Sequence, residues 1–518
     1  MTTVVLGLDG ASFELIQPWI DDGSLPAFRR LVSDGAATGM QSCLPPVTCP
    51  NWQCYATGLN PGQLGVFWWE LIDAADRTIE STSASHDFDG RHYWRYLDGK
   101  SAIINLPTSY PPPESVNGVH IAGGPGAEQS GYTTPEQLER ELEQSYDYAV
   151  HPQHLGDLSA ERTDSDCVAE IYALIDTRFD VLETYVQSGE FELVHLTVFY
   201  INVLQHFYWD HDVVRTAWER IDDRLGDLLA MEELDTLFVM SDHGSNEIDV
   251  TFNINAWLER EGYLTTTGSV SSFLHRFGIT RERIRPVLAS LDIEWWLRRF
   301  VPRRIQVLLP DDSGSVTKSA KGNVVNWEES VALGSGQGPL YILSDDPAER
   351  SQVREELRAR LDGLTHEGQR VIEGALPAED VYEGRYVDRG PDIVLRQAPG
   401  VHIAEALGGD HDPFESPAKW RGENKETGLF VAHGSHVDSD AQLNDMHILD
   451  IAPTVLHLQG TPVPSNVDGE VRTELFVDGS EPATREPQTQ APVGPTEEAG
   501  ANVDSDVSDR LSDLGYLQ

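Results

Sequence analysis

Three short apolar segments, each followed at once by polar residues, constrain the fold of this chain more than any other feature. The segments are residues 4–8, 191–199 and 236–240, and they are followed by Asp9-Gly10, Tyr200-Ile201-Asn202 and Ser241-Asp242-His243-Gly244. Apolar runs of this length are typical of strands that are buried on both faces. We therefore predict a parallel α/β sheet with a site along one edge, where the polar clusters meet.

Segments with helical spacing of apolar residues alternate with these strands. They cover residues 135–148, 168–188, 213–231 and 348–361, and the last begins after Asp345-Asp346-Pro347, a cap-like start. Strands that alternate with such helices predict a doubly wound α/β layer.

The length of 518 residues fits about three domains, or one large α/β domain with insertions. We predict one main domain over residues 1–476, with an insertion at about 265–322, where the pattern changes to short helices and turns. Residues 477–505 are rich in Pro, Glu, Thr and Gly, which predicts a disordered acidic linker. Residues 506–518 are predicted to form a short C-terminal helix.

The charge balance excludes one class of partner. Asp and Glu number 85 against 37 Lys and Arg, so the formal net charge is -48, which argues against nucleic-acid binding. Only five of the basic residues are lysines. An acidic, lysine-poor surface is typical of proteins adapted to concentrated salt, so we expect a halophilic, archaeal source. A dedicated cation-binding protein is the alternative reading of this charge.

The cysteines and the apolar runs indicate where in the cell the protein is located. Cys43, Cys49, Cys54 and Cys167 form no CxxC pair, and four cysteines in so long a chain are expected to be small core residues. The N-terminus has no charged leader, and no apolar run approaches the roughly 18 residues of a membrane span. We expect a cytoplasmic protein without a transmembrane segment.

Asp9, Thr48, Asp242 and His243 are the residues best suited to chemistry. Carboxylate and imidazole are ligand types for Zn or Mn. A threonine hydroxyl is a poor nucleophile at neutral pH, and coordination to a divalent metal is one way to activate it. Each residue alone also has an ordinary structural reading, since an Asp after a strand usually caps a helix and a His beside it usually hydrogen-bonds in a turn.

The order of several short stretches is more informative than any single residue. These stretches are Leu6-Gly7-Leu8-Asp9-Gly10, Pro46-Val47-Thr48-Cys49-Pro50-Asn51-Trp52, Gln205-His206-Phe207, Ser241-Asp242-His243-Gly244 and Asp450-Ile451-Ala452-Pro453-Thr454-Val455-Leu456. Together they resemble the alkaline phosphatase superfamily, in particular the type I phosphodiesterase/nucleotide pyrophosphatase-like proteins. The resemblance spans nearly the whole chain. It implies an α/β/α sandwich with a mostly parallel central sheet and an inserted cap region.

The resemblance also implies a mechanism for residues 1–476 as a catalytic domain. Thr48 would be the nucleophile that attacks phosphorus and forms a phosphothreonine intermediate. Asp9, Thr48, Asp242 and His243 would bind one metal ion, Zn or Mn. This metal would lower the pKa of the hydroxyl and neutralise charge on the phosphoryl oxygens.

The second metal site of the family is altered in this sequence. Asn202 stands where the family has an Asp four residues before the His, here His206, and Asn424 stands where it has a later His. Neutral amides are weaker ligands than carboxylate and imidazole. His411 could supply the missing imidazole, or it could be an exposed loop residue. We predict one tightly bound metal, a doubtful second one, and His206 as a phosphate ligand or acid/base group.

The leading function is a metal-dependent phosphoric-ester hydrolase with a threonine nucleophile, of the phosphodiesterase/nucleotide pyrophosphatase type. Its substrate would be a phosphorylated small molecule, a nucleotide, or a glycan or lipid phosphate. The alternatives are a phosphotransferase or phosphomutase of the same superfamily, or a non-catalytic binding protein. The intact Asp9, Thr48, Asp242 and His243 favour an enzyme, whereas Asn202 and Asn424 favour the binding protein.

Two further segments have open interpretations. Trp69 stands where the nucleotide pyrophosphatases have a phosphate-binding Asn, so Trp68-Trp69 could stack on a base or pack in a wall. Residues 276–304 hold eight arginines with interleaved aromatic residues, which could steer a phosphorylated substrate, touch an anionic lipid surface, or pair with acidic neighbours. His195 and His211 are interpreted as structural, and His433 and His436 stay ambiguous.

Overall fold

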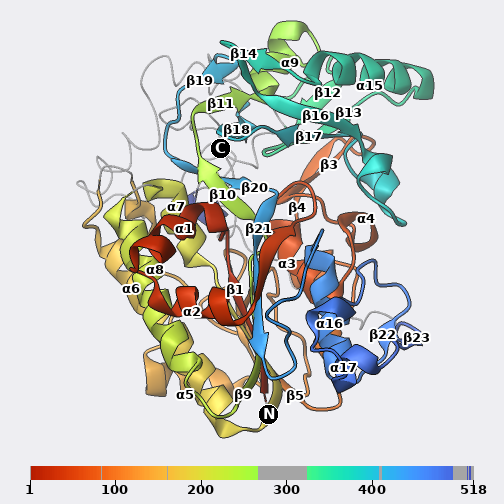
Figure 1. The fold of residues 1–518 in the computed structure, drawn as a ribbon. Helices are drawn as coiled ribbons and strands as arrows, with labels where there is room; N and C mark the ends of the chain where they lie inside the picture. The colour runs from red at the N-terminus through yellow and green to blue at the C-terminus, as the bar shows by residue number, and fades with distance from the viewer. Residues whose placement is uncertain are drawn as a thin grey trace.

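The protein is built on an eight-stranded sheet, described here from a computed structural model (Figure 1). The structure describes residues 2–82, 84–159, 162–209, 211–266, 322, 324–407, 411–493, 510, 511, 513 and 514. The strands, in spatial order, are β2 (Ala36–Gln41), β21 (Thr427–Gly434), β9 (Leu234–Met240), β1 (Thr2–Leu8), β8 (Phe191–Val198), β5 (Lys100–Pro107), β6 (Gly118–Gly123) and β7 (Thr133–Thr134). The five strands from β9 to β6 are parallel, and the outer ones pair antiparallel. This confirms the predicted mostly parallel central sheet.

Helices cover both faces of this sheet (Figure 1). One face packs against α1 (Phe13–Asp22), α2 (Pro26–Asp34), α5 (Gln137–Tyr146), α6 (Asp166–Ser188), α7 (Tyr200–Tyr208) and α8 (Asp212–Leu228). The other packs against α3 (Thr48–Thr57) and α16 (Ile451–Leu458). In β1, Val4, Leu6 and Leu8 join the first core and Val5 joins the second. Such a strand has no polar face, because alternate side chains enter two different cores.

A smaller part of the chain forms a cap with its own core, at the top of Figure 1. The chain leaves the main sheet through β10 (Gly244–Glu247) and returns through β20 (Gly422–Lys425), and these two strands pair antiparallel. The cap contains two sheets and two helices. One sheet has the strand order β18 (Val401–Ala404), β11 (Val250–Asn253), β19 (Phe414–Glu415), and the other has the order β12 (Ala332–Gly334), β13 (Pro339–Ile342), β17 (Ile393–Gln397), β16 (Ile372–Pro377). The helices are α9 (Ile254–Glu261) and α15 (Pro347–Leu361).

Smaller elements complete the fold. They are β3 (Glu70–Asp73), β4 (Thr78–Ser81), α4 (Pro61–Leu64), β14 (Thr365–His366), β15 (Gln369–Arg370), β22 (Val463–Pro464), α17 (Glu481–Thr484), β23 (Thr489–Gln490) and seven short 3-10 helices among the described residues, Ser85–Asp87, Tyr93–Tyr96, Leu155–Asp157, Ala378–Asp380, Val387–Arg389, Ile448–Asp450 and Thr473–Leu475. The predicted helices correspond to α5, α6, α8 and α15. The predicted insertion lies, except at its ends, outside the described residues, as does the arginine-rich segment 276–304.

The first part of the predicted disordered linker is ordered, so that prediction is wrong for residues 477–493. Ser480 caps α17, and β23 pairs parallel with β22. Pro482 accepts a hydrogen bond from His457 Nε2 at 2.8 Å. Few apolar residues are needed here, because polar contacts with α16 hold the segment. Residues 494–509 lie outside the described part of the chain.

The predicted C-terminal helix is described at four positions only. Leu511 and Leu514 are buried in the first core. Arg510 pairs with Glu128 at 2.8 Å, and Trp420 Nε1 donates to the carbonyl of Leu514 at 2.9 Å. These residues therefore dock on the main body of the protein.

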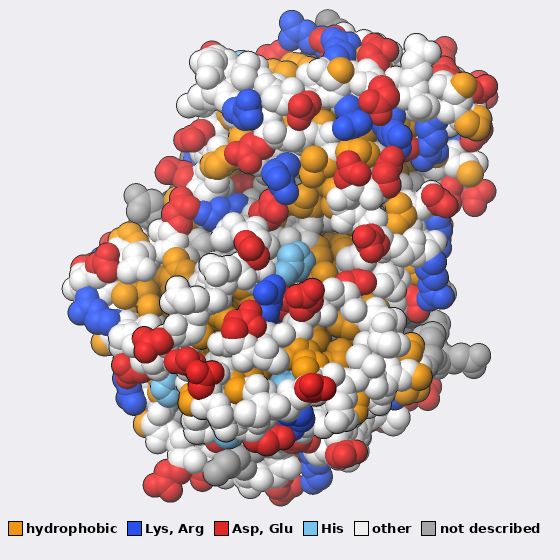
Figure 2. Space-filling view, turned by 45° about the vertical axis from the view of Figure 1, so that its right-hand side comes forward, with side chains coloured by type: hydrophobic (Ala, Val, Ile, Leu, Met, Phe, Trp, Pro, Cys, Tyr) orange, Lys and Arg blue, Asp and Glu red, His pale blue; other side chains and the backbone are white. Residues whose placement is uncertain are grey.

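The surface and the cysteines agree with the composition. Acidic side chains are spread over the whole visible face in Figure 2, rather than gathered in one patch. All four cysteines are free and buried. Within the described residues, no helix combines the length and the apolar character needed to cross a membrane.

Candidate metal centre and nucleophile

The carboxyl ends of β1 and β9 bring the predicted site residues together. Asp9 follows the last residue of β1, and Asp242 and His243 follow the end of β9, the neighbouring parallel strand. Thr48 is the first residue of α3, on the opposite face from α7. Residues up to 234 positions apart therefore meet at the sheet edge predicted from the apolar runs.

The distances are short enough for a common ligand. Thr48 Oγ1 donates to Asp9 Oδ1 at 3.3 Å and lies 3.4 Å from His243 Nε2. The same Nε2 is 3.1 Å from Asp242 Oδ2 and 3.7 Å from Asp9 Oδ1. One ligand atom each from Asp9, Asp242 and His243 lies within 4.8 Å of the others. A metal with ligands at about 2.0–2.2 Å requires this kind of convergence.

Burial makes the charges of this cluster costly unless a cation balances them. The side chains of Asp9, Thr48, Asp242 and His243 are all 0% exposed. Burial, and then repulsion from Asp242, raises the pKa of Asp9 well above its usual value, although His243 and a hydrogen bond from Trp52 oppose this shift. Burial alone would lower the pKa of His243, but Asp242 and then Asp9 raise it to about 9. The raised pKa of His243 thus reflects the negative charge of the cluster, whereas that of Asp9 reflects burial first and the charge of Asp242 second.

Two hydrogen bonds orient the ligand atoms. His243 Nδ1 donates to the carbonyl of Gly244 at 2.9 Å, so Nε2 is directed to the cluster. Asp242 Oδ1 accepts from the Gly10 amide at 3.2 Å, whereas Oδ2 is directed to the cluster, 3.1 Å from His243 Nε2. Both carboxylate oxygens are buried, so a cation that balances their charge would lower the cost of burial. The donor set fits Zn or Mn, because it offers two carboxylates, an imidazole and a hydroxyl.

The loop before Thr48 is held by Asn51. Its Nδ2 donates to the carbonyls of Cys43, Pro45 and Val47 at 2.9–3.2 Å, and its Oδ1 accepts from the Cys43 amide at 2.8 Å. This buried side chain uses its hydrogen-bonding groups to fix the approach to α3.

Sequence reasoning missed the role of Trp52. Its indole Nε1 donates to Asp9 Oδ2 at 2.8 Å, so it holds the carboxylate oxygen that does not face Thr48. The four-residue spacing from Thr48 to Trp52 does not predict this contact, because the backbone of Cys49 between them is not helical.

Asn202, His206 and Asn424 also meet; none of the three is a carboxylate, but Asn202 hydrogen-bonds to Asp9. Asn202 Nδ2 lies 3.2 Å from His206 Nε2 and donates to Asn424 Oδ1 at 3.4 Å. His206 Nδ1 donates to the carbonyl of Gly422 at 2.8 Å. Burial lowers the pKa of His206 to about 3, so its neutral form is favoured. A Cβ at Gly10 would lie 2.2 Å from Asn202 Oδ1, so Gly10 permits this close approach.

The contacts of His206 include a residue with no signal in the sequence. The ring of Trp420 stacks on that of His206 at 3.8 Å between centroids and 8° between planes. Trp420 comes from the segment that returns from the cap and also bonds to Leu514. No local pattern relates residues that are 214 positions apart, so this contact depends on the tertiary fold.

His411 has a different neighbour from the one considered in the sequence. Its Nδ1 lies 3.5 Å from Glu415 Oε1, in the cap strand β19, and it does not join the metal-ligand cluster of the described residues. The side chain of His411 is only 12% exposed, so it is not the exposed loop residue considered as the alternative either.

Several other aromatic residues are structural. Trp68 and Trp69 are 2% and 0% exposed in the main core, which agrees with wall packing rather than stacking on a base. His195 hydrogen-bonds to Tyr55 and Thr197, and His211 accepts from the Val213 amide at the start of α8. His433 pairs with Leu237 in β9, away from the end of that strand where Asp242 lies.

Comparisons with known proteins agree with this arrangement. The family model of type I phosphodiesterase / nucleotide pyrophosphatase matches residues 3–436. No curated protein matches the chain. Two solved structures of phosphonoacetate hydrolase from Sinorhizobium meliloti 1021, in complex with phosphonoacetate and with phosphonoformate, are similar in fold. Their TM-scores are 0.56 and 0.52 and their identities 14% and 13%, over 89% of this chain and 95% of theirs. The chain belongs to the type I phosphodiesterase/nucleotide pyrophosphatase family, and is thus a phosphoester hydrolase.

Proposed function

We propose that Thr48 is the nucleophile of a metal-dependent phosphoric-ester hydrolase, and that Asp9, Thr48, Asp242 and His243 hold one divalent metal, Zn or Mn. The observation that carries the proposal is the position of Thr48 Oγ1, 3.3 Å from Asp9 Oδ1 and 3.4 Å from His243 Nε2 in a fully buried cluster. The metal, when bound, would lower the pKa of the hydroxyl and offset charge on the phosphoryl group.

The side chains around Thr48 have the following roles in the proposed reaction. Asp9 and the loop held by Asn51 orient Thr48, whose oxygen attacks phosphorus as the bond to the leaving oxygen breaks. A water molecule then cleaves the phosphothreonine bond and regenerates the hydroxyl. His206 is proposed to contact the phosphoryl group or to exchange a proton through Nε2, since its Nδ1 proton is held by Gly422. The substrate of the enzyme is proposed to be a phosphorylated small molecule, a nucleotide, or a glycan or lipid phosphate.

The first test removes the hydroxyl. Thr48→Ala is expected to reduce release of nitrophenol from mono- and bis-p-nitrophenyl phosphate by several orders of magnitude, while circular dichroism shows a folded protein. Thr57→Ala, at the other end of α3, is the matched control and should keep its activity. Acid quenching during turnover should trap a phosphate on Thr48, detectable by mass spectrometry. Turnover by Thr48→Ala at the wild-type rate would refute the nucleophile.

The second test counts the metal. Elemental analysis of the wild-type protein should give one tightly bound Zn or Mn per chain, because amides occupy two positions of the second site. Asn202→Asp combined with Asn424→His should raise this number toward two. Two tightly bound metals in the unmodified protein would contradict the one-metal proposal. His411 would then be the candidate for the missing ligand of the second metal.

One observation favours a second candidate function. The direct contact of Asn202 with Asn424 at 3.4 Å favours a one-metal site, which suits transfer to an alcohol in a phosphotransferase or phosphomutase. Turnover in the presence of glycerol separates the two functions: a phosphorylated glycerol product supports transfer, and inorganic phosphate or a monoester from water supports hydrolysis. Metal binding without either product would support the non-catalytic binding protein.

A further inference from the structure

A buried arginine that has no acidic partner among the described residues lies outside the metal centre. Arg178 in α6 is 4% exposed. Its Nη2 donates to the carbonyls of Ala149 and Val150 at 2.7 and 3.0 Å, whereas Nη1 is buried and has no hydrogen-bond partner among the described residues. Its guanidinium also lies over the ring of Tyr148, 4.7 Å from the centroid. These contacts hold the group in place but supply no negative charge.

Neighbouring arginines in the same layer of helices do form ion pairs. Arg224 in α8 pairs with Asp180 and Glu183 of α6, and Arg220 pairs with Asp176 of α6 at 2.8 Å. The chain carries 85 acidic residues against 37 basic ones. The lack of an ion pair at Arg178, within the described part of the chain, is therefore not due to a shortage of acids. A buried, unpaired charge is costly, and a bound counter-ion would remove that cost.

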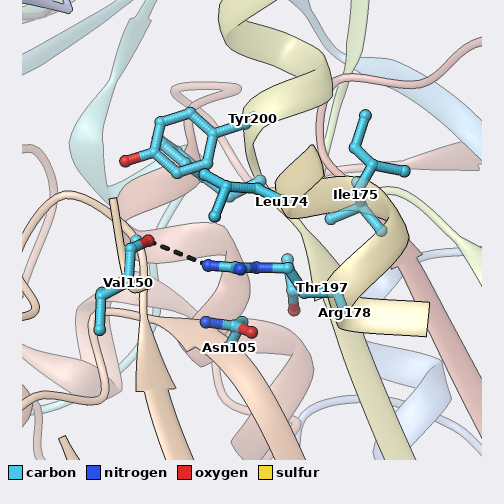
Figure 3. A pocket seen from close by; sticks show the side chains of 10 residues that line it. Asn105, Val150, Leu174, Ile175, Arg178, Thr197 and Tyr200 are labelled. Atoms are coloured by element: carbon cyan, nitrogen blue, oxygen red, sulfur yellow. Dashed lines mark hydrogen bonds between the residues drawn. The ribbon is translucent and has the colours of Figure 1, made fainter. Parts of the chain in front are cut away.

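Arg178 lines a small cavity that has room for about one water-sized ligand (Figure 3). Its guanidinium lies between Asn105 and Tyr200 in that view. The remaining lining is largely apolar and includes no Asp or Glu; the residues are Gly124, Val150, Leu174, Ile175, Thr197, Val198 and Phe199. None of them belongs to the Asp9 and Thr48 cluster.

The polar groups of the cavity leave donors rather than acceptors for a ligand. Asn105 Oδ1 already accepts from Tyr148 Oη at 2.5 Å, and Tyr200 Oη bonds to His151 Nδ1 at 2.7 Å. No hydrogen bond among the described residues uses the Asn105 amide nitrogen. Arg178 Nη1 and Asn105 Nδ2 therefore remain to bind an acceptor.

We propose that this cavity is a binding site for one halide ion, held by Arg178 Nη1 and Asn105 Nδ2. One guanidinium balances one negative charge, and the apolar lining disfavours a doubly charged phosphate or sulfate. The anion joins α6 to the carboxyl ends of β5 and β8, and Tyr200 is the first residue of α7. Anion binding should therefore stabilise the folded protein.

The test compares anions at constant ionic strength. Replacing sodium gluconate, whose anion is too bulky and hydrated for the cavity, by sodium chloride should raise the melting temperature of the wild type in a saturable way. Sodium acetate, whose anion is also larger than the cavity, should give no such response. Arg178→Met should abolish the response. Arg220→Met, which loses an already paired arginine, should keep it.

A second variant keeps the test valid if Arg178→Met does not fold. Asn105→Asp is isosteric, keeps an oxygen for Tyr148, and suits the positive φ of 58° at this position. It places a carboxylate beside Arg178, so it should melt at a higher temperature than the wild type in gluconate and lose the chloride response. Crystals grown with bromide should show an anomalous peak within hydrogen-bond distance of Arg178 Nη1 in the wild type. An equal chloride response in Asn105→Asp and wild type, or no bromide peak, would overturn the proposal.

Discussion

Gly7 lies in β1 two residues before Asp9, and Gly7→Ala tests how closely the strand and the site are packed. A Cβ at residue 7 would lie 2.4 Å from Cη2 and 2.7 Å from Cζ3 of Trp52. This ring is fully buried, and its Nε1 bond to Asp9 opposes any rotation. Overpacking of a core costs about 1–3 kcal/mol, and loss of a hydrogen bond to a charged group about 1.5–3 kcal/mol. We expect Gly7→Ala to reduce the free energy of unfolding by about 2–5 kcal/mol.

Urea unfolding followed by circular dichroism measures this change. Trp52→Phe removes the atoms that the new methyl group meets, so the double variant should be more stable than the sum of the single losses predicts, by about 1 kcal/mol or more. Gly226→Ala in α8 is the control: its nearest neighbour would be 3.7 Å away, and replacing a helical glycine should stabilise by about 0.5–1 kcal/mol. A Gly7→Ala protein as stable as the wild type, or strict additivity with Trp52→Phe, would refute the packing argument.

Two further predictions concern stability. Burial lowers the pKa of His120, His151 and His195 to about 3, so these rings stay neutral in the folded protein and take up protons on unfolding below pH 6.5. The free energy of unfolding should fall as the pH drops from 7 to 5, and His195→Gln should reduce the slope by about 1.4 kcal/mol per pH unit; an unchanged slope would contradict this. Deletion of residues 480–493 should lower the melting temperature in calorimetry, because it removes the contacts of α17 with α16, and an unchanged melting temperature would show that these contacts contribute nothing.

Local patterns were sufficient to predict the central strands and the residues at their ends. β1, β8 and β9 are buried on both faces, so their sequences are continuous apolar runs, and Asp9 and Asp242 follow at a fixed edge. The stacking of Trp420 on His206 could not be predicted, because the cap separates the two residues along the chain. The order in residues 477–493 was missed for another reason: composition measures apolar content, whereas this segment binds backbone carbonyls through Arg485 and strand pairing.

The charge of the buried cluster explains why amides at the second position suit a single metal. Asp9 and Asp242 supply two negative charges, which one dication balances if His243 is neutral. Asn202 hydrogen-bonds to Asp9 and lies 3.2 Å from His206 Nε2, so an aspartate there would add a third negative charge to a site with no exposed surface. Only a second cation would offset that charge at low cost. The double variant proposed above therefore changes the charge and the ligand set together, since Asn424→His adds the imidazole that a second metal requires.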